Sequence, residues 1–506
     1  MSGTTLNCGC SFTTQETDPC LIVIFGASGD LAARKLVPSL YRLYSQGSLS
    51  DNFVIVGASR TPMSDAEFCS HIEQNLPSQS AEEKKSWTDF AGHLRYLQLE
   101  YDSPESFLNL AASLTSLDLE FQTGGNRIFY LATPPSLYGQ IATQLGEAGL
   151  AQGNKGASWA RIVVEKPFGH DTQSAVALDR TIKRSFTEEQ VFRIDHYLAK
   201  ETVQNILMLR FANTIFEPIW NRSYIQYVGI ITAEGLGVEH RAGYYEQAGV
   251  IRDMFQNHMM QLLALTAMEP PSLLETNRVR DEKMKVFGAL KSLDEDTLGE
   301  HIILGQYGAG TIAGQAVPAY RDEEGVDPKS CTPTFAMMRL FVDTWRWKGV
   351  PFYLASGKRL KGKMTKIVVQ FKEVPHSLFH GALEASIPAN RLVIGVYPEE
   401  KITLRFEAKG QGPSLCLAPV NMEFTYPKNK EFSFDSYEKV LLDCIQGDHM
   451  LFWHQQGIEQ SWAFLEPVLQ LSDCAKYTSS LHPYPAGSWG PDNARKWMSL
   501  LVDCSV

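Results

Sequence analysis

The chain of 506 residues lacks any long hydrophobic run, and it lacks an excess of positive charge. No apolar stretch approaches the roughly 18 residues that a membrane span requires, and residues 1–19 have neither the charged start nor the apolar centre of a secretory signal. The 46 Lys and Arg residues against 57 Asp and Glu give a formal net charge of -11, which disfavours nucleic acid or an anionic membrane as a partner. We therefore expect a cytoplasmic protein with no membrane and no nucleic-acid partner.

Paired cysteine motifs are also lacking. The nine cysteines are odd in number and irregularly spaced, which suits a reducing compartment, where thiols fill the core. Cys8 and Cys10 form a C-x-C pattern in a polar tail, but no second ligand pair follows them. No metal site is predicted.

What the chain does contain is two kinds of strand pattern. In the first half, short apolar strands alternate with helical segments, which is typical of a parallel doubly wound sheet of Rossmann type. After about Phe211 the strands lengthen and predict a β+α domain with a large, mostly antiparallel sheet. We predict a flexible tail over 1–20, a Rossmann-like α/β domain over 21–198 and a β+α domain over 199–506. The clearest strands are predicted over 21–25, 53–57, 127–132, 161–164, 191–194, 224–232, 334–341, 366–371, 391–396 and 401–408.

Ligands of a doubly wound sheet bind outside the carboxyl ends of its strands. The first strand end reads G-A-S-G-D-L, that is Gly26, Ala27, Ser28, Gly29, Asp30 and Leu31. Glycines let a backbone approach a pyrophosphate, and the helix predicted over 31–44 would turn its N-terminus toward that group. This segment therefore predicts a dinucleotide site.

Three further strand ends refine this prediction. The second ends in A-S-R, and Arg60 suits a 2'-phosphate where an NAD site would place an acid, so the predicted cofactor is NADP. Tyr138 follows the third strand and is expected to cover the nicotinamide side. Lys166 follows the fourth and can reach both cofactor and substrate. The alternative for Arg60 is an exposed arginine at a strand end with no ligand, and the alternative for Lys166 is an ordinary surface lysine.

The fifth strand end reads R-I-D-H-Y-L-A-K-E over 193–201. If a helix begins here, His196 and Lys200 lie one turn apart on one face and can converge on a single anion, with the Tyr197 hydroxyl beside them. The alternative is an ordinary helix start with Asp195 as its cap.

A helix predicted over 250–267, entered at Gly249, carries another candidate. Met254, His258 and Leu262 form one stripe on an α-helix, so His258 points inward. A lone inward histidine is more often a core residue than a base. Here Asp253 flanks it, and Asp195 is available to orient it.

Taken together, these residues resemble the glucose-6-phosphate dehydrogenase family. The matching motifs are G-A-S-G-D-L-A at Gly26, E-K-P-F-G at Glu165, R-I-D-H-Y-L-A-K-E at Arg193, R-F-A-N at Arg210 and I-R-D-M-F-Q-N-H at Ile251. The resemblance runs from about Leu21 nearly to the C-terminus. It implies hydride transfer from C1 of glucose 6-phosphate to NADP+, and a large sheet that forms the interface of a homodimer or a dimer of dimers.

The resemblance also implies a role for each candidate residue. His258 would be the base and Asp195 the acid that orients it. Lys166 would bridge sugar and cofactor. The expected ligands of the 6-phosphate are His196, Tyr197 and Lys200, helped by Lys358 or Lys363, and those of the sugar hydroxyls are Glu234 and Asp253.

Two other functions are compatible with these motifs, and the chain differs from some family members at one set of positions. Another NADP-dependent sugar oxidoreductase, of the glucose-fructose oxidoreductase type, also carries E-K-P after a Rossmann strand, and a non-catalytic NADP-binding sensor is the second alternative. Some family members hold an additional structural NADP+ beside the large sheet through basic residues. Met364, Val368 and Gly395 stand at those positions here, so we predict a single bound dinucleotide.

Overall fold

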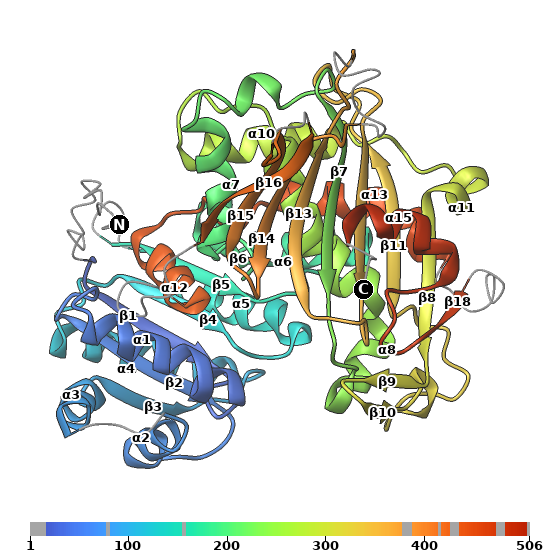
Figure 1. Ribbon diagram of the computed structural model, residues 1–506. Helices are drawn as coiled ribbons and strands as arrows, with labels where there is room; N and C mark the ends of the chain where they lie inside the picture. The colour runs from blue at the N-terminus through green and yellow to red at the C-terminus, as the bar shows by residue number, and fades with distance from the viewer. Residues whose placement is uncertain are drawn as a thin grey trace. The chain divides into compact units, whose positions relative to one another are not determined.

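A computed structural model describes residues 17–76, 81–153, 158–376, 387–412, 416–425, 435–471 and 481–502. The chain divides into two compact units (Figure 1). Unit 1 comprises Met1–Lys166, Ala177–His196 and Phe434–Phe452, and unit 2 comprises Pro167–Val176, Tyr197–Ser433 and Trp453–Val506. Sequence analysis placed one boundary after residue 198, whereas each compact unit is assembled from three separate segments.

Unit 1 is built on a parallel sheet in the order β3-β2-β1-β4-β5-β6, with β17 at the edge beyond β6. This is the strand order of a Rossmann-type fold, in which the direction of winding reverses between β1 and β4. The predicted doubly wound sheet is thus confirmed. The edge strand β3 was missed because it alternates polar and apolar residues and is only half-buried. The strands are β1 (Cys20–Phe25), β2 (Phe53–Ser59), β3 (Leu94–Gln98), β4 (Arg127–Leu131), β5 (Ala160–Val164), β6 (Val191–Ile194) and β17 (Phe452–Trp453).

The helix after β1 is already helical at Asp30 and Leu31, runs as a π-helix over η1 (Ala32–Leu36) and continues as α1 (Val37–Ser45). A late helix, α12 (Ser436–Gln446), packs on α1, where Arg42 forms ion pairs with Asp435 and Glu438. The buried side chains Val440, Leu441 and Ile445 of α12 also hold this distant segment in unit 1. The remaining helices before residue 190 are α2 (Asp65–Glu73), α3 (Ala81–Ala91), α4 (Pro104–Glu120), η2 (Pro135–Leu137), α5 (Tyr138–Glu147), α6 (Thr172–Ile182) and η3 (Glu188–Gln190).

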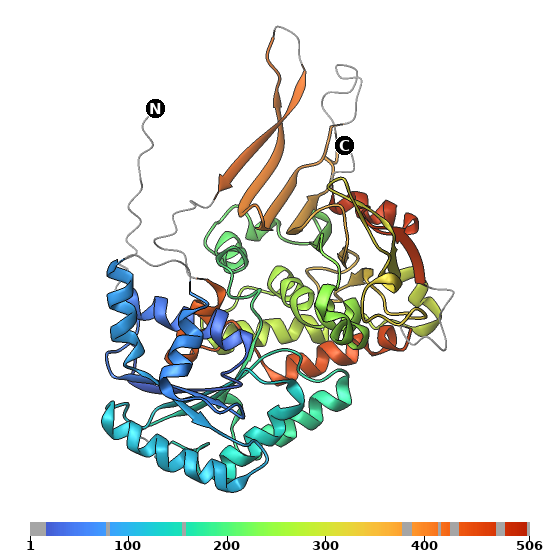
Figure 2. The same cartoon turned by 90° about the horizontal axis from the view of Figure 1, so that it is seen from below.

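Unit 2 is built on a nine-stranded sheet in the order β16-β15-β14-β13-β7-β12-β11-β8-β18. Only the pairs β7–β12 and β8–β18 are parallel, so the predicted mostly antiparallel sheet is confirmed. The hairpin of β15 and β16 extends away from the other strands (Figure 2). The strands are β7 (Ile225–Ala233), β8 (Ile302–Gly308), β11 (Phe335–Phe341), β12 (Pro351–Gly357), β13 (Met364–Phe371), β14 (Arg391–Tyr397), β15 (Lys401–Lys409), β16 (Leu417–Thr425) and β18 (Leu481–Pro485), with a separate hairpin of β9 (Gly310–Ile312) and β10 (Gln315–Val317).

Two helix predictions need correction. The predicted helix does not begin at Asp195. The residues that follow, up to Lys200, form turns and a bend, and Lys200 has an extended backbone (φ -72°, ψ 131°). The helix starts at Glu201. The helix predicted over 250–267 is a π-helix followed by an α-helix. The helices of this region are α7 (Glu201–Phe211), α8 (Ala242–Val250), η6 (Ile251–Met259), α9 (Met260–Ala267), α10 (Thr276–Gly288), α11 (Leu298–His301), α13 (Gln455–Leu471) and α15 (Arg495–Leu501), with 3-10 turns η4 (Glu217–Ile219), η5 (Glu239–Arg241), η7 (Glu295–Thr297), η8 (Tyr320–Asp322) and η9 (Asp492–Ala494).

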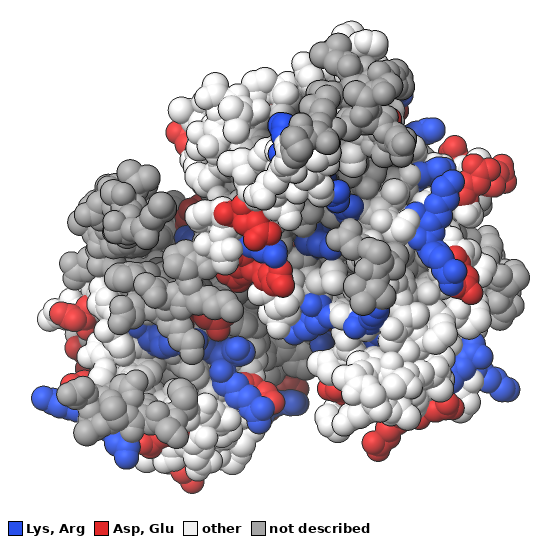
Figure 3. Space-filling model, viewed as in Figure 1, with Lys and Arg blue, Asp and Glu red and all other residues white. Residues whose placement is uncertain are grey.

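Within the described ranges, no helix combines the length and the apolar character needed to cross a bilayer. On the face drawn in Figure 3, Lys and Arg side chains are interspersed with Asp and Glu. The cysteines at positions 20, 69, 416 and 444 are free thiols. Cys8 and Cys10 lie outside the described residues.

Candidate active site

The segment after β1 makes a tight turn against the neighbouring strand β4. Gly26 has φ of 80°, and a Cβ there would lie 2.5 Å from the Ala132 carbonyl oxygen, so a side chain is excluded by both backbone strain and space. The Gly29 N–H closes the turn onto the Gly26 carbonyl at 3.0 Å. Ala27 is buried, and the exposed Asp30 carboxylate pairs with Arg34 at 3.3 Å. The turn leads through Leu31 into η1, so backbone N–H groups of a helix start lie at the switch point of the sheet.

Hydroxyl groups gather beside this turn at the end of β2. The Ser28 and Ser59 hydroxyl oxygens are 2.8 Å apart, and the Thr61 hydroxyl donates to Ser28 at 3.2 Å. Arg60, which lies between Ser59 and Thr61 in the sequence, is exposed. Its guanidinium carbon is 5.9 Å from the centroid of the Tyr101 ring. Hydroxyls beside an exposed guanidinium fit a ribose that carries a phosphate. Sequence analysis named Arg60 but missed Thr61, which lies beyond the strand end.

Tyr138, the first residue of α5, is only 1% exposed. Burial, together with the Glu165 carboxylate, raises the pKa of Tyr138, so the phenol stays neutral. Its predicted contact with nicotinamide stays a prediction.

The end of β5 carries a buried carboxylate that sequence analysis did not assign. The Tyr130 hydroxyl donates to Glu165 Oε1 at 2.5 Å, and His196 Nε2 lies 3.1 Å from Oε2. Burial by itself raises the pKa of Glu165, but His196, Tyr130 and the charge of Lys166 bring it below its ordinary value, so the side chain is ionised. The His196 ring also lies 4.4 Å from the Tyr437 ring. Glu165 thus orients His196, and its place in the E-K-P motif was the available signal.

In unit 2 the predicted residues Tyr197, Lys200 and His258 come together. The Tyr197 ring stacks on the His258 ring with centroids 4.0 Å apart and planes at 24°. Lys200 Nζ lies 4.3 Å from the centroid of the same tyrosine ring, a cation–π contact. His258 is buried at 3% exposure, so the stack fixes its ring plane. Asp195, which is also buried, directly follows β6 and belongs to unit 1, and its predicted pairing with His258 stays a prediction.

Two predicted lysines meet at a tyrosine that sequence analysis missed. Lys200 Nζ lies 5.5 Å from the centroid of the Tyr397 ring, and Lys363 Nζ lies 4.6 Å from it. Two ammonium groups around one aromatic ring create a positive region that suits an anion. No local pattern marks Tyr397, because it reaches Lys363 through the pairing of β13 with β14 and Lys200 through the packing of α7 on β14.

Lys358 is held differently from Lys363. Its Nζ lies 2.5 Å from the Glu234 carboxylate, and the Tyr245 ring centroid is 5.0 Å away. Asp253 is buried and accepts a hydrogen bond from the Tyr244 hydroxyl at 3.4 Å. Glu234 and Asp253 therefore each present a carboxylate beside a side-chain donor, an arrangement that can accept from sugar hydroxyls.

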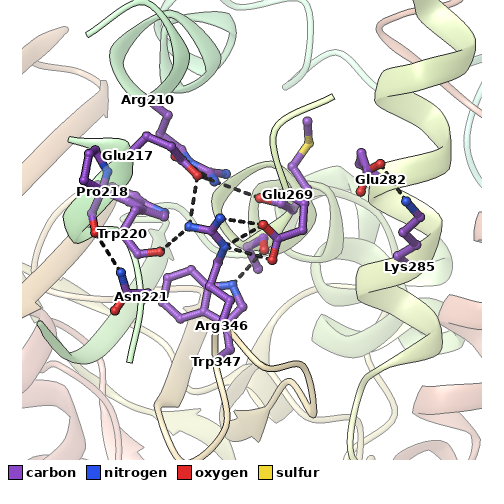
Figure 4. A network of polar contacts seen from close by, with 12 residues as sticks. Arg210, Glu217, Pro218, Trp220, Asn221, Glu269, Glu282, Lys285, Arg346 and Trp347 are labelled. Atoms are coloured by element: carbon purple, nitrogen blue, oxygen red, sulfur yellow. Dashed lines mark hydrogen bonds and ion pairs between the residues drawn. The ribbon is translucent and has the colours of Figure 1, made fainter. Parts of the chain in front are cut away.

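The C-terminal end of the His258-bearing helix is anchored by Arg210, from the R-F-A-N motif (Figure 4). The fully buried guanidinium donates to the carbonyls of Leu265 at 3.0 Å, Thr266 at 3.2 Å and Met268 at 2.8 Å. Burial lowers the pKa of Arg210 to about 10, so it remains charged. Its charge is balanced by Glu217 at 3.2 Å. A cation that satisfies the last carbonyls stabilises a helix end.

A second layer completes this anchor. Arg346 bridges Glu217 at 2.9 Å and Glu269. The indole N–H groups of Trp220 and Trp347 donate to the Thr266 and Ala267 carbonyls at 2.8 and 2.7 Å. The helix that carries His258 thus has a rigid end.

Comparison with known proteins places the chain in a family. Residues 23–205 match the model "Glucose-6-phosphate dehydrogenase, NAD binding domain", and residues 207–500 match "Glucose-6-phosphate dehydrogenase, C-terminal domain". The glucose-6-phosphate 1-dehydrogenase of Aggregatibacter actinomycetemcomitans is 42% identical over 482 residues, which cover 95% of this chain and 96% of the relative. That of Bacillus subtilis is 44% identical over 480 residues, or 94% and 96% of the two chains.

Comparison with solved structures gives the same family. A glucose-6-phosphate dehydrogenase in complex with its substrate glucose-6-phosphate is 34% identical, has a TM-score of 0.87, and the match covers 96% of this chain and 97% of the other. The Mycobacterium avium enzyme is 32% identical with a TM-score of 0.79, over 95% and 97% of the chains. With both family models matched and the strand order and motifs in agreement, this chain belongs to the glucose-6-phosphate dehydrogenase family.

Proposed function

We propose that this protein oxidises the C1 hydroxyl of D-glucose 6-phosphate with NADP+, giving 6-phospho-D-glucono-1,5-lactone and NADPH. This is the first oxidative step of the pentose phosphate pathway. The observation that carries the proposal is the match of both family domains across residues 23–205 and 207–500. The comparisons do not favour another sugar oxidoreductase of the glucose-fructose oxidoreductase type.

His258 is the proposed base that removes the C1 hydroxyl proton. Its ring plane is restrained by the stack on Tyr197 at 4.0 Å. Asp195 is the proposed acid that accepts the other ring N–H and stabilises the imidazolium that forms. NADP+, when bound, supplies the acceptor for the hydride.

The cofactor is assigned to the turn over 26–31 with its hydroxyl neighbours. The N-terminus of η1 suits a pyrophosphate, and the Ser28, Ser59 and Thr61 hydroxyls with Arg60 suit a 2'-phosphate. Lys166 stays assigned between cofactor and sugar.

The 6-phosphate is assigned to Lys200 and Lys363, whose ammonium groups share the Tyr397 ring, with His196 and Tyr197 as further ligands. Glu234 and Asp253 are assigned to sugar hydroxyls. Lys358 is assigned an indirect role, because its ion pair with Glu234 at 2.5 Å orients that carboxylate.

We also propose a homodimer, or a dimer of dimers, formed through the large sheet in the cytoplasm. The edge strand β16 exposes Met422 at 62% and Phe424 at 52%, and exposed apolar side chains on an edge strand favour association. Light scattering after size exclusion tests this proposal. A wild-type dimer that becomes monomeric on Phe424→Asp supports it, and a wild-type monomer contradicts it.

The catalytic proposal is tested by the absorbance of reduced nicotinamide with glucose 6-phosphate and NADP+. The controls replace the sugar phosphate by glucose, or NADP+ by NAD+. Comparable rates with free glucose would favour the glucose-fructose type, and NADP+ binding without turnover would identify a sensor. Asp195→Asn is expected to lower turnover without abolishing binding, since an amide cannot stabilise an imidazolium.

A further inference from the structure

The helix that carries His258 changes its hydrogen-bond spacing beside the candidate active site. After Gly249, whose φ of 54° interrupts the preceding helix, residues Ile251–Met259 form a π-helix. At its end the Met260 N–H donates to the Phe255 carbonyl, five residues back, and α9 then continues with α-helical spacing. π-Helical turns are rare and are frequent at functional sites.

The π spacing decides which side chains share a face. In an α-helix, residues five apart point about 140° away from each other, because each residue turns about 100°. In a π-helix, the bonded residues five apart lie about one turn above one another. Asp253 and His258 are five apart, and both are buried, at 5% and 3% exposure. The π-helix therefore brings the proposed sugar ligand and the proposed base onto one face.

The π-helix ends at Met259 and α9 begins at Met260, so the Gln256 carbonyl directly follows the Phe255 carbonyl, which accepts the last π bond. The structure gives the Gln256 carbonyl a partner from another helix. The Ser461 hydroxyl, from α13, donates to the Gln256 carbonyl at 2.9 Å, and both residues are fully buried. A carbonyl at a change of helical spacing needs such a donor, because a side chain or water must complete the interrupted ladder. The neighbouring Trp462 indole N–H donates to the Phe168 carbonyl at 3.1 Å, so α13 is itself fixed at this point.

We propose that Ser461 is a positioning residue for catalysis: its hydroxyl holds the π-helical turn that places Asp253 and His258 on one face. This inference rests on the proposed roles of these two residues. Ser461 itself has no proposed contact with substrate or cofactor, and it acts through the Gln256 carbonyl.

The test compares three purified full-length variants. Ser461→Ala removes the donor and is expected to lower kcat about tenfold, because small misplacements of a base are amplified in the rate, while the KM for NADP+ stays unchanged. Ser461→Thr keeps a hydroxyl and is expected to retain most of kcat even where its added methyl lowers the melting temperature. Thr266→Val is the matched control. It removes a buried hydroxyl that donates at 2.7 Å to the Leu262 carbonyl in the α-helical part of the same helix, so stability falls and kcat does not.

A second measurement separates positioning from mere destabilisation. With glucose 6-phosphate deuterated at C1, Ser461→Ala is expected to show a larger isotope effect on kcat than the wild type, because the chemical step has become slower. A Ser461→Ala variant with wild-type kcat and isotope effect overturns the inference, as does a loss of kcat in all three variants that merely tracks melting temperature. If His258→Asn is inactive while Ser461→Ala is normal, the proposed function stands and only this inference fails.

Discussion

Replacing Arg210 by Lys tests whether the His258-bearing helix depends on its C-terminal anchor. The guanidinium is fully buried and distributes its N–H groups among the carbonyls of Leu265, Thr266 and Met268 and the carboxylate of Glu217. A lysine keeps the charge, but its compact ammonium cannot reach several carbonyls in the same directions. The substitution therefore changes geometry and not net charge.

The expected loss follows from the partners left behind. At least two of the three carbonyls lose a charged donor, and a hydrogen bond to a charged group contributes about 1.5 to 3 kcal/mol. Allowing for the contact that the ammonium regains, we expect the free energy of unfolding of unit 2 to fall by about 3 to 4 kcal/mol. The indole donors Trp220 and Trp347 still hold the helix end at 2.8 and 2.7 Å, so the fold survives.

Urea unfolding followed by tryptophan fluorescence measures this change as a shift of the midpoint at constant slope. The matched control is Arg222→Lys, because this guanidinium lies over the 88% exposed ring of Trp345, and surface changes cost less than about 0.5 kcal/mol. Faster amide exchange at the end of α9 is expected only in Arg210→Lys. A loss below about 1 kcal/mol, similar to that of the control, would refute the anchoring role.

Four further predictions concern the site. His258→Asn is expected to lower turnover about 100-fold with little change in binding; near wild-type turnover would remove His258 as the base. Lys200→Ala is expected to weaken glucose 6-phosphate by about 2 to 3 kcal/mol, and an equal loss with free glucose would contradict a phosphate contact. Arg60→Ala is expected to weaken NADP+ much more than NAD+, measured by fluorescence titration, whereas equal losses would assign Arg60 to the fold. Calorimetry of stripped protein is expected to give one tight NADP+ per chain, since Met364, Val368 and Gly395 supply no cation for a second dinucleotide; two tight sites would contradict this.

Local patterns predicted the strands of unit 1 that are buried on both faces and named the candidate side chains, but they missed the edge strand β3 and, in unit 2, β8, β12, β16 and β18. The apolar runs before Gly26, Arg60 and Lys166 predicted parallel strands because a strand buried on both faces must be apolar along its whole length. The structure has these strands as β1, β2 and β5. The polar residues that follow such runs lie at one edge of the sheet, which is why the cofactor turn could be named from sequence.

The sequence pattern predicted helix starts and helix types less well than strands. The R-I-D-H-Y-L-A-K-E segment has residues compatible with a helix cap, yet the helix begins only at Glu201. Likewise the pattern of Met254, His258 and Leu262 fits an α-helix, whereas η6 is a π-helix. Propensity does not distinguish these spacings, because packing against other elements decides which carbonyls find donors.

The sequence by itself determined the family motifs and much of the strand pattern, and it named the candidate acid, base and cationic residues. Only the tertiary structure decided how they are supported. Glu165 orients His196, Tyr397 gathers Lys200 and Lys363, and Ser461 reaches the Gln256 carbonyl from another helix. These contacts join residues far apart in the chain, and no local period records them, because a buried polar group is satisfied by whichever donor the fold brings near.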